Sequence, residues 1–421
     1  MNRPPVSGLA SAMAPPFLLP GEHFAAALGF LLCGAVGAIL IAPELAAGAF
    51  PAPRVVAVTH LFTLGWITTS IMGALYQFLP VALQEPVRSI RAGHVAFALH
   101  VPGVMAFVTG MALGVAWLML AGAVTFGAGV LLFVVNLGAT LRRATRRDVT
   151  WWALAGADLF LGVTLVLGLA LAGNLRWGYL GAARFTALGT HLHVALAGWV
   201  LLVIVGVSQR LLPMFLLSHG VGEGLAKAAV ALLASGAALL TVGHHGPPLV
   251  SRWLPALLLC SGLGAFLVQA LQFYLRRHRP TLDPGMRLAA MALAILAVGT
   301  TLAAGALAFP AMSRASMIYV LVLLLGITLF VAAQYYKIVP FLIWYHRFGP
   351  LAGRQPVPRV SELFSAPAAG VAGALLVLGT VMLAAMIVLG SPMGARAGAV
   401  LLAGGVVVET VQMSALARRR P

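Results

Sequence analysis

Long apolar stretches, separated by short polar stretches rich in arginine, follow one another along the whole chain. An α-helix rises 1.5 Å per residue, so about 20 apolar residues cross a hydrocarbon core of about 30 Å. The chain has twelve stretches of this kind. The expected spans are residues 22–43, 53–82, 92–114, 116–140, 151–173, 184–216, 225–243, 251–275, 286–309, 313–345, 364–390 and 394–416. The pattern predicts an all-α polytopic membrane protein with about twelve transmembrane helices.

Composition supports this fold class. Hydrophobic residues make up 61% of the 421 positions and charged residues only 8%, whereas a soluble domain is about one quarter charged. Residues 1–20 are rich in proline and are expected to form a disordered lead, and 21–421 are expected to form a single transmembrane domain. We expect a multi-pass protein of a cell membrane, such as a bacterial inner membrane, with the lipid bilayer as its partner.

The distribution of basic residues predicts orientation. The formal net charge is +17, and the arginines lie mainly in short loops, which is a topology signal and does not indicate a nucleic acid partner. Loops after even-numbered spans are the richer ones, for example Arg142, Arg143, Arg146 and Arg147 after the fourth span. Both termini are therefore expected on the cytoplasmic side.

One sequence pattern occurs twice. Residues 59–80 read THLFTLGWITTSIMGALYQFLP and residues 190–213 read THLHVALAGWVLLVIVGVSQRLLP. An offset of 133 residues places His60 on His193 and the Gly-Trp pair at 65–66 on the pair at 198–199. A weaker third copy, without the histidine, ends at Pro340. The chain is predicted to contain three four-helix repeats, roughly 21–148, 149–284 and 285–421, in a pseudo-threefold arrangement.

The repeated histidines are candidate ligands. A histidine inside a bilayer is costly and marks a functional site by default. His60 and His193 are expected at similar depth in the outer half of the membrane, where two imidazoles can bind the iron of a b-type haem from opposite sides. His191 is two residues away and points roughly 200° round the helix, so it faces a different site. His191 or His193, together with His244 and His245, could equally bind copper.

Three arginines lie on loops expected on the outer side. Arg54, Arg176 and Arg184 are candidates to bind haem propionates. Arginine is also common as an ordinary anchor at the membrane interface, and both interpretations stay open.

The expected architecture and the two histidine motifs resemble subunit I of the haem–copper oxidase superfamily, including its nitric-oxide-reductase branch. The chain is more loosely similar to NnrS-type haem- and copper-containing membrane proteins. The resemblance implies that His60 ligates a low-spin haem, and that His193 or His191 binds copper with His244 and His245. The family's tenth span carries a His-x-His motif that the tenth span of this chain lacks, so a complete dinuclear centre is not predicted.

These features predict a redox membrane protein that transfers electrons or handles nitric oxide or oxygen. An enzyme of this kind would be an oxidoreductase, of oxidase or nitric oxide reductase type. Quinol or cytochrome c is then a candidate electron donor, and further subunits are possible partners. Two alternatives remain: a transporter or a haem or metal carrier built on the same repeated scaffold, and a cofactor-free structural subunit.

Overall fold

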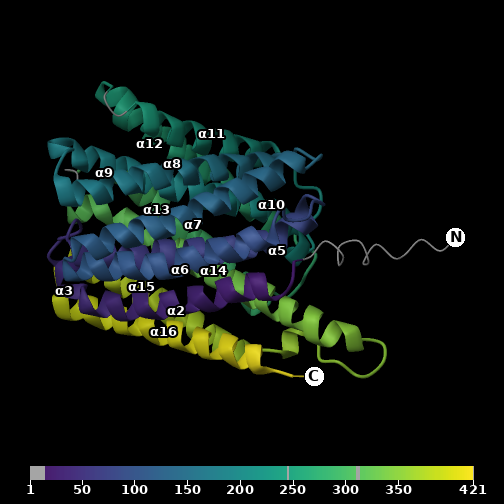
Figure 1. Ribbon diagram of the computed structural model, residues 1–421. Coiled ribbons are helices and arrows are strands. Elements are labelled where there is room, and N and C mark those ends of the chain that lie inside the picture. Colours follow the sequence, from purple (N-terminus) through teal and green to yellow (C-terminus); the bar gives the residue numbers. More distant parts are fainter. Residues whose placement is uncertain (1–14, 244–245, 310–312, 421) are drawn as a thin grey trace. The chain divides into compact units, whose positions relative to one another are not determined.

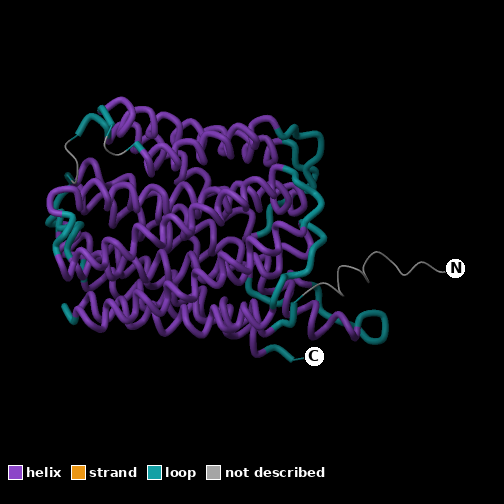
Figure 2. Tube along the Cα trace, turned by 45° about the horizontal axis from the view of Figure 1, so that its top comes forward, coloured by secondary structure: helices purple, strands orange, loops and turns teal. Residues whose placement is uncertain are grey.

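The computed structural model describes residues 15–243, 246–309 and 313–420. Every regular element in these ranges is a helix, and Figure 2 shows the helices joined by loops. Twelve helical segments are long and apolar enough to cross a membrane. The prediction of an all-α protein with twelve such helices is confirmed for the described residues. Helix α2 begins at Leu18, so the last three residues assigned to the disordered lead are helical.

The chain divides into two compact units. Unit 1 comprises residues 1–24 and 68–278, and unit 2 comprises residues 25–67 and 279–421. The break at 278/279 lies close to the expected repeat boundary at 284/285, whereas the other two breaks fall inside continuous helical segments. Helix α2 (Leu18–Leu40) and the π-helix η1 (Leu61–Thr68) each contribute residues to both units.

Unit 1 contains most of the first two expected repeats (Figure 1). Its further elements are α5 (Thr69–Ala82), α6 (Ile90–Leu113), α7 (Ala116–Arg143), α8 (Val149–Trp177), η2 (Gly181–Ala183), α9 (Arg184–His193), η3 (Val194–Leu201), α10 (Leu202–Leu216), α11 (Gly224–Val242), η4 (Leu249–Trp253) and α12 (Leu254–Leu275).

Unit 2 contains the third expected repeat and residues 25–67. Its further elements are α3 (Ala42–Ala46), α4 (Pro53–His60), α13 (Pro284–Ala306), α14 (Arg314–Ile343), η5 (Trp344–Phe348), η6 (Gly349–Leu351), η7 (Val360–Glu362), α15 (Ala366–Val388) and α16 (Pro392–Arg418).

Polar side chains define where several helices begin. In each case a serine or aspartate just before the helix accepts a hydrogen bond from the backbone N–H three residues on, which satisfies one of the amides that a helix start leaves unpaired. These N-caps are Ser89, Asp148, Asp283, Ser365 and Ser391. At the other end, Gly114 and Gly178 end α6 and α8 with φ of 71° and 69°, a conformation that favours glycine.

Small residues allow neighbouring helices to pack closely within each unit. A Cβ on Gly103 of α6 would collide with the backbone of Phe126 in α7, and one on Gly122 would collide with Phe107. Figure 1 draws α6 and α7 as neighbours in unit 1. Helices α15 and α16 approach in the same way in unit 2, where Gly398 lies against the backbone of Leu383. Close glycine contacts of this kind are typical of membrane helices.

A side-chain amide joins the end of one helix to the start of the preceding helix in three places. Asn136 of α7 accepts from the N–H of Ser89 (3.0 Å) and donates to its carbonyl (2.9 Å). Gln269 of α12 donates to the Gly222 carbonyl (2.9 Å), and Gln412 of α16 accepts from the Ser365 N–H (3.2 Å). The two partners are 47 residues apart every time.

Candidate functional site

The two repeated histidines have the same local geometry, each within its own unit. His60 is the last residue of α4 in unit 2, and His193 is the last residue of α9 in unit 1. The Nδ1 atom of His60 lies 2.7 Å from the Val56 carbonyl, and that of His193 lies 2.7 Å from the Gly189 carbonyl. A carbonyl only accepts, so Nδ1 carries the proton in both rings and a neutral ring has its lone pair on Nε2.

A π-helix begins immediately after each of these histidines. Segment η1 covers Leu61–Thr68 and segment η3 covers Val194–Leu201, eight residues in each case. The wider turn changes the rotation of the residues before it relative to those after it, and π-helical turns occur frequently at functional sites. In the third sequence copy, which lacks the histidine, α14 is α-helical from Arg314 to Ile343.

Each π-helix carries the Gly-Trp pair of the repeat. A Cβ on Gly65 or on Gly198 would come within 2.7 Å of the Cβ of Phe30 or of Phe160, respectively. The following tryptophans, Trp66 and Trp199, are buried. The Trp199 indole N–H donates to the Thr68 hydroxyl at 3.2 Å. These contacts fix the segments that follow the two histidines.

The remaining predicted copper ligands do not form a described cluster. His191 is half-buried in α9, and its Cε1 would lie 3.0 Å from a Cβ on Gly168 of α8. His244 and His245 lie outside the described residues. Within the described part of the chain, no group of three or more histidine, cysteine, aspartate or glutamate residues is arranged to hold a metal ion. A copper site that includes the pair at 244–245 stays a prediction.

The three arginines predicted to bind propionates are all exposed. Arg54 forms an ion pair with Glu44 at 2.9 Å, within unit 2. The Arg184 guanidinium lies 4.7 Å from the centre of the Phe185 ring, and Arg176 lies in the last turn of α8, where a cation interacts favourably with the helix dipole. Each arginine therefore has a local structural role, and propionate binding stays a prediction.

Unit 1 also contains a partly buried polar cluster that the sequence did not predict. The Nδ1 of His94 lies 2.7 Å from a carboxylate oxygen of Glu22, and the Nε2 of His100 lies 3.0 Å from the Thr69 hydroxyl. His23 is fully buried, and its Nδ1 donates to the Leu19 carbonyl at 2.7 Å. The sequence shows that these histidines lie in apolar stretches, which marks each of them as a candidate. It does not show that they lie close together, because the packing of separate helices brings them near one another.

His23 shows that the Nδ1 contact alone does not define a ligand. It has the same bond to a carbonyl four residues earlier as His60 and His193. Its ring lies between two aromatic rings, with centroids 4.8 Å from Phe97 and 5.4 Å from Tyr76. The residues after His23 are α-helical up to Leu40, where α2 ends. The π-helix after His60 and His193 is thus the feature that separates these two histidines from His23.

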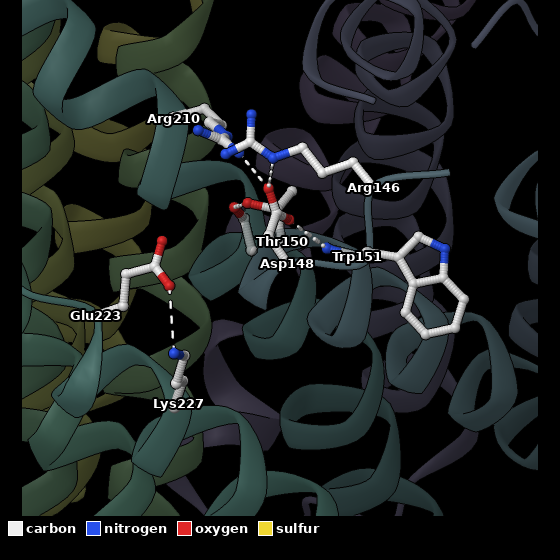
Figure 3. A network of polar contacts seen from close by, with 8 residues as sticks. Arg146, Asp148, Thr150, Trp151, Arg210, Glu223 and Lys227 are labelled. Carbon is white, nitrogen blue, oxygen red and sulfur yellow. Dashed lines mark hydrogen bonds and ion pairs between the residues drawn. The ribbon is translucent and has the colours of Figure 1, made fainter. Parts of the chain in front are cut away.

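The N-cap aspartates of α8 and α13 form similar ion pairs. Figure 3 shows Arg146 and Arg210 both directed at the Asp148 carboxylate. This carboxylate also caps α8, because it accepts a hydrogen bond from the Trp151 backbone N–H. In unit 2, Lys337 pairs with Asp283 at 2.6 Å. Arg210 and Lys337 each lie three residues before the proline that ends its sequence copy, Pro213 or Pro340.

Two acidic residues of the helices have buried carboxylate oxygens. Both oxygens of Glu409 in α16 are buried, and neither has a hydrogen-bond partner among the described residues. One oxygen of Asp158 in α8 is also buried without such a partner. A buried carboxyl group without hydrogen bonds destabilises the fold, so both positions are functional candidates.

No family model matches the chain, and no curated protein matches it. Its function must therefore be inferred from the residues and their geometry.

Proposed function

We propose that the protein is a membrane-embedded redox protein that binds b-type haem through His60 and His193, and that it transfers electrons or handles nitric oxide or oxygen. The observation that carries this proposal is the shared geometry of the two histidines. Each has Nδ1–H bound to a backbone carbonyl at 2.7 Å, and each is followed by an eight-residue π-helix.

The histidine geometry fits haem ligation. A metal-ligating histidine almost always donates its other ring N–H to a carbonyl or carboxylate, which fixes the tautomer and orients the ring. The Val56 and Gly189 carbonyls supply this bond, so Nε2 is the ligating nitrogen in both residues. When bound, the haem supplies the redox chemistry. The chain's part would be to hold each neutral imidazole in the orientation that its Nδ1–H bond fixes.

The proposal includes three four-helix repeats, with both termini in the cytoplasm. The amide contacts of Asn136, Gln269 and Gln412, each 47 residues from its partner, support the repeat. So do the equivalent contacts of Gly65 with Phe30 and of Gly198 with Phe160. The arginine-rich loops support the orientation, and on that basis His60 and His193 belong to the outer half of the membrane.

The test is a reduced-minus-oxidised visible spectrum of purified His60→Ala and His193→Ala variants beside the wild-type protein. Loss of either ligand should abolish the b-type α band or shift it to that of a haem with one histidine. Imidazole added to either variant should restore part of the band, because it replaces the missing ligand without repairing a misfolded chain. His278→Ala is the control, because this histidine is exposed in the loop after α12.

Three outcomes would contradict haem ligation by this pair. One is an unchanged haem spectrum in both variants. A second is a wild-type protein that contains stoichiometric copper and no haem, which would favour the site formed by His191 or His193 with His244 and His245. The third is a protein with neither haem nor copper, which would favour the transporter, carrier or structural alternatives.

A further inference from the structure

A small pocket lies at one end of unit 1, and neither His60 nor His193 lines it. It is formed by the start of α8, the end of α10, the segment before α11 and the end of α12. Its volume is about 120 Å³, enough for several water molecules. Its apolar lining includes Pro213 and Phe273. Its polar side chains are those of Thr150, Gln209, Arg210, Ser218, Glu223 and Gln269.

Two buried polar atoms of the lining have no partner within the described chain. Ser218 is 6% exposed and Gln269 is 1% exposed. The Gln269 Nε2 group donates to the Gly222 carbonyl at 2.9 Å, which fixes the orientation of the amide and leaves Oε1 without a donor. The Ser218 hydroxyl also has no hydrogen-bond partner. Leaving such groups unpaired is unfavourable, so both residues are candidates to bind an occupant that offers a donor to Gln269 and a partner to Ser218.

The charges around the pocket favour an anion. Figure 3 shows Arg146 and Arg210 sharing the Asp148 carboxylate, and Glu223 paired with Lys227 at 3.5 Å. Arg276 donates to the carbonyl of Gly220, another lining residue. These groups comprise four cations, Arg146, Arg210, Lys227 and Arg276, and two carboxylates. The pocket therefore lies in a region with an excess of positive charge, in which Arg210 is a lining residue.

We propose that this pocket binds a phosphate group that carries, or lies beside, a hydrogen-bond donor. Arg210 and the Ser218 hydroxyl bind the phosphate oxygens, and the donor pairs with Gln269 Oε1. Phosphatidylethanolamine and phosphatidylglycerol headgroups have this chemistry, because an ammonium or hydroxyl group lies beside the phosphodiester. Hydrogen phosphate has it too, because one of its own oxygens is protonated. Phosphatidylcholine does not, because its quaternary ammonium has no N–H.

The surroundings of the pocket suit a lipid headgroup. It lies where four of the apolar helical segments end, and a phospholipid headgroup occupies that depth of a membrane. The exposed side chains of Met214, Leu217 and Leu275 belong to the same helix ends and can contact the acyl chains. Basic residues near helix ends favour anionic headgroup atoms.

The experiment measures the thermal unfolding midpoint of the full-length protein in detergent with four additives. These are phosphatidylethanolamine, phosphatidylglycerol, phosphatidylcholine and inorganic phosphate, and lipids retained after purification are identified by mass spectrometry. We expect the first two lipids to raise the midpoint more than phosphatidylcholine at equal concentration. A rise with inorganic phosphate alone, without any lipid preference, would assign the same phosphate chemistry to a soluble ligand. Equal responses to all three lipids and none to phosphate would overturn the proposal, leaving a water-filled pocket.

Two variants locate the effect. Ser218→Ala removes a buried hydroxyl that has no partner among the described residues, so it should not lower the ligand-free midpoint. It should weaken binding about tenfold, the effect of about one hydrogen bond. Arg210→Gln should abolish the preference. Lys337→Gln is its control, since it removes the similar ion pair with Asp283 in unit 2, where no lining residue of the pocket lies. An unchanged lipid preference in both Ser218→Ala and Arg210→Gln would refute the assignment to this pocket.

Discussion

Adding one methyl group to Gly198 tests the packing that follows His193. In the folded protein a Cβ at this position would lie 2.7 Å from the Cβ of Phe160. Two carbon atoms in favourable contact are about 3.5–4.0 Å apart, so α8 or the π-helix η3 must shift by about 1 Å. Overpacking of this kind costs about 1–3 kcal/mol.

A second variant on the same segment provides the comparison. Gly189 has nothing within 4 Å of the position of a Cβ. Replacing a helical glycine by alanine where space is open should stabilise the fold by about 0.5–1 kcal/mol. The two variants share this gain in helix propensity, so their difference in unfolding free energy, about 1–3 kcal/mol, reports the packing against Phe160.

The assay is equilibrium unfolding of the two variants in the same detergent or lipid. We expect Gly189→Ala to be at least as stable as the wild-type protein and Gly198→Ala to be clearly less stable than Gly189→Ala. The same comparison in unit 2 uses Gly65→Ala, whose Cβ would lie 2.7 Å from that of Phe30, and Gly29→Ala, which has open space. If Gly198→Ala were as stable as Gly189→Ala, the close contact and the role assigned to the glycine would be wrong.

Three further changes test other contacts by the same assay. Asp148→Asn keeps the N-cap of α8 but loses both ion pairs, so it should lower the unfolding free energy by about 1–3 kcal/mol. Asp148→Ala also loses the cap and should lower it by about 1 kcal/mol more, and equal losses in the two variants would contradict the capping role. Glu409→Met removes two buried oxygens that have no partner among the described residues and should stabilise the fold by about 1–3 kcal/mol, whereas a loss of stability would reveal an interaction that this account omits. Asn136→Leu removes two hydrogen bonds to Ser89 and should cost about 2 kcal/mol, and an unchanged stability would mean that water replaces them.

The sequence was sufficient to predict the helices because the signal is local. An apolar stretch of 20 residues between arginines predicts a membrane helix without any knowledge of its neighbours. The stretch predicted at 364–390 corresponds to α15 at Ala366–Val388, for example. The first helix was placed less well, since α2 begins at Leu18, four residues before the expected span, and ends at Leu40. Proline at position 20 is compatible with the first turn of a helix, where its missing N–H is not needed.

The candidate site was predictable only in part. The sequence pattern predicts that His60 and His193 are equivalent. In the structure each has an Nδ1 contact of 2.7 Å with the carbonyl four residues earlier, and the repeat itself stays a prediction. The π-helices after them could not be predicted, since a wider helical turn has no residue pattern of its own. The cluster around His23 was also missed, because only the packing of α2 against α5 and α6 brings its members together.

The central claim is that the chain binds b-type haem, and its most direct test is a pyridine haemochrome assay on the purified wild-type protein. Copper content and the reduced-minus-oxidised visible spectrum are measured on the same sample. The account predicts haem b in stoichiometric amount, with the spectrum of a haem bound by two histidines. A colourless protein, purified with haem available during expression and folded by its unfolding transition, would contradict it.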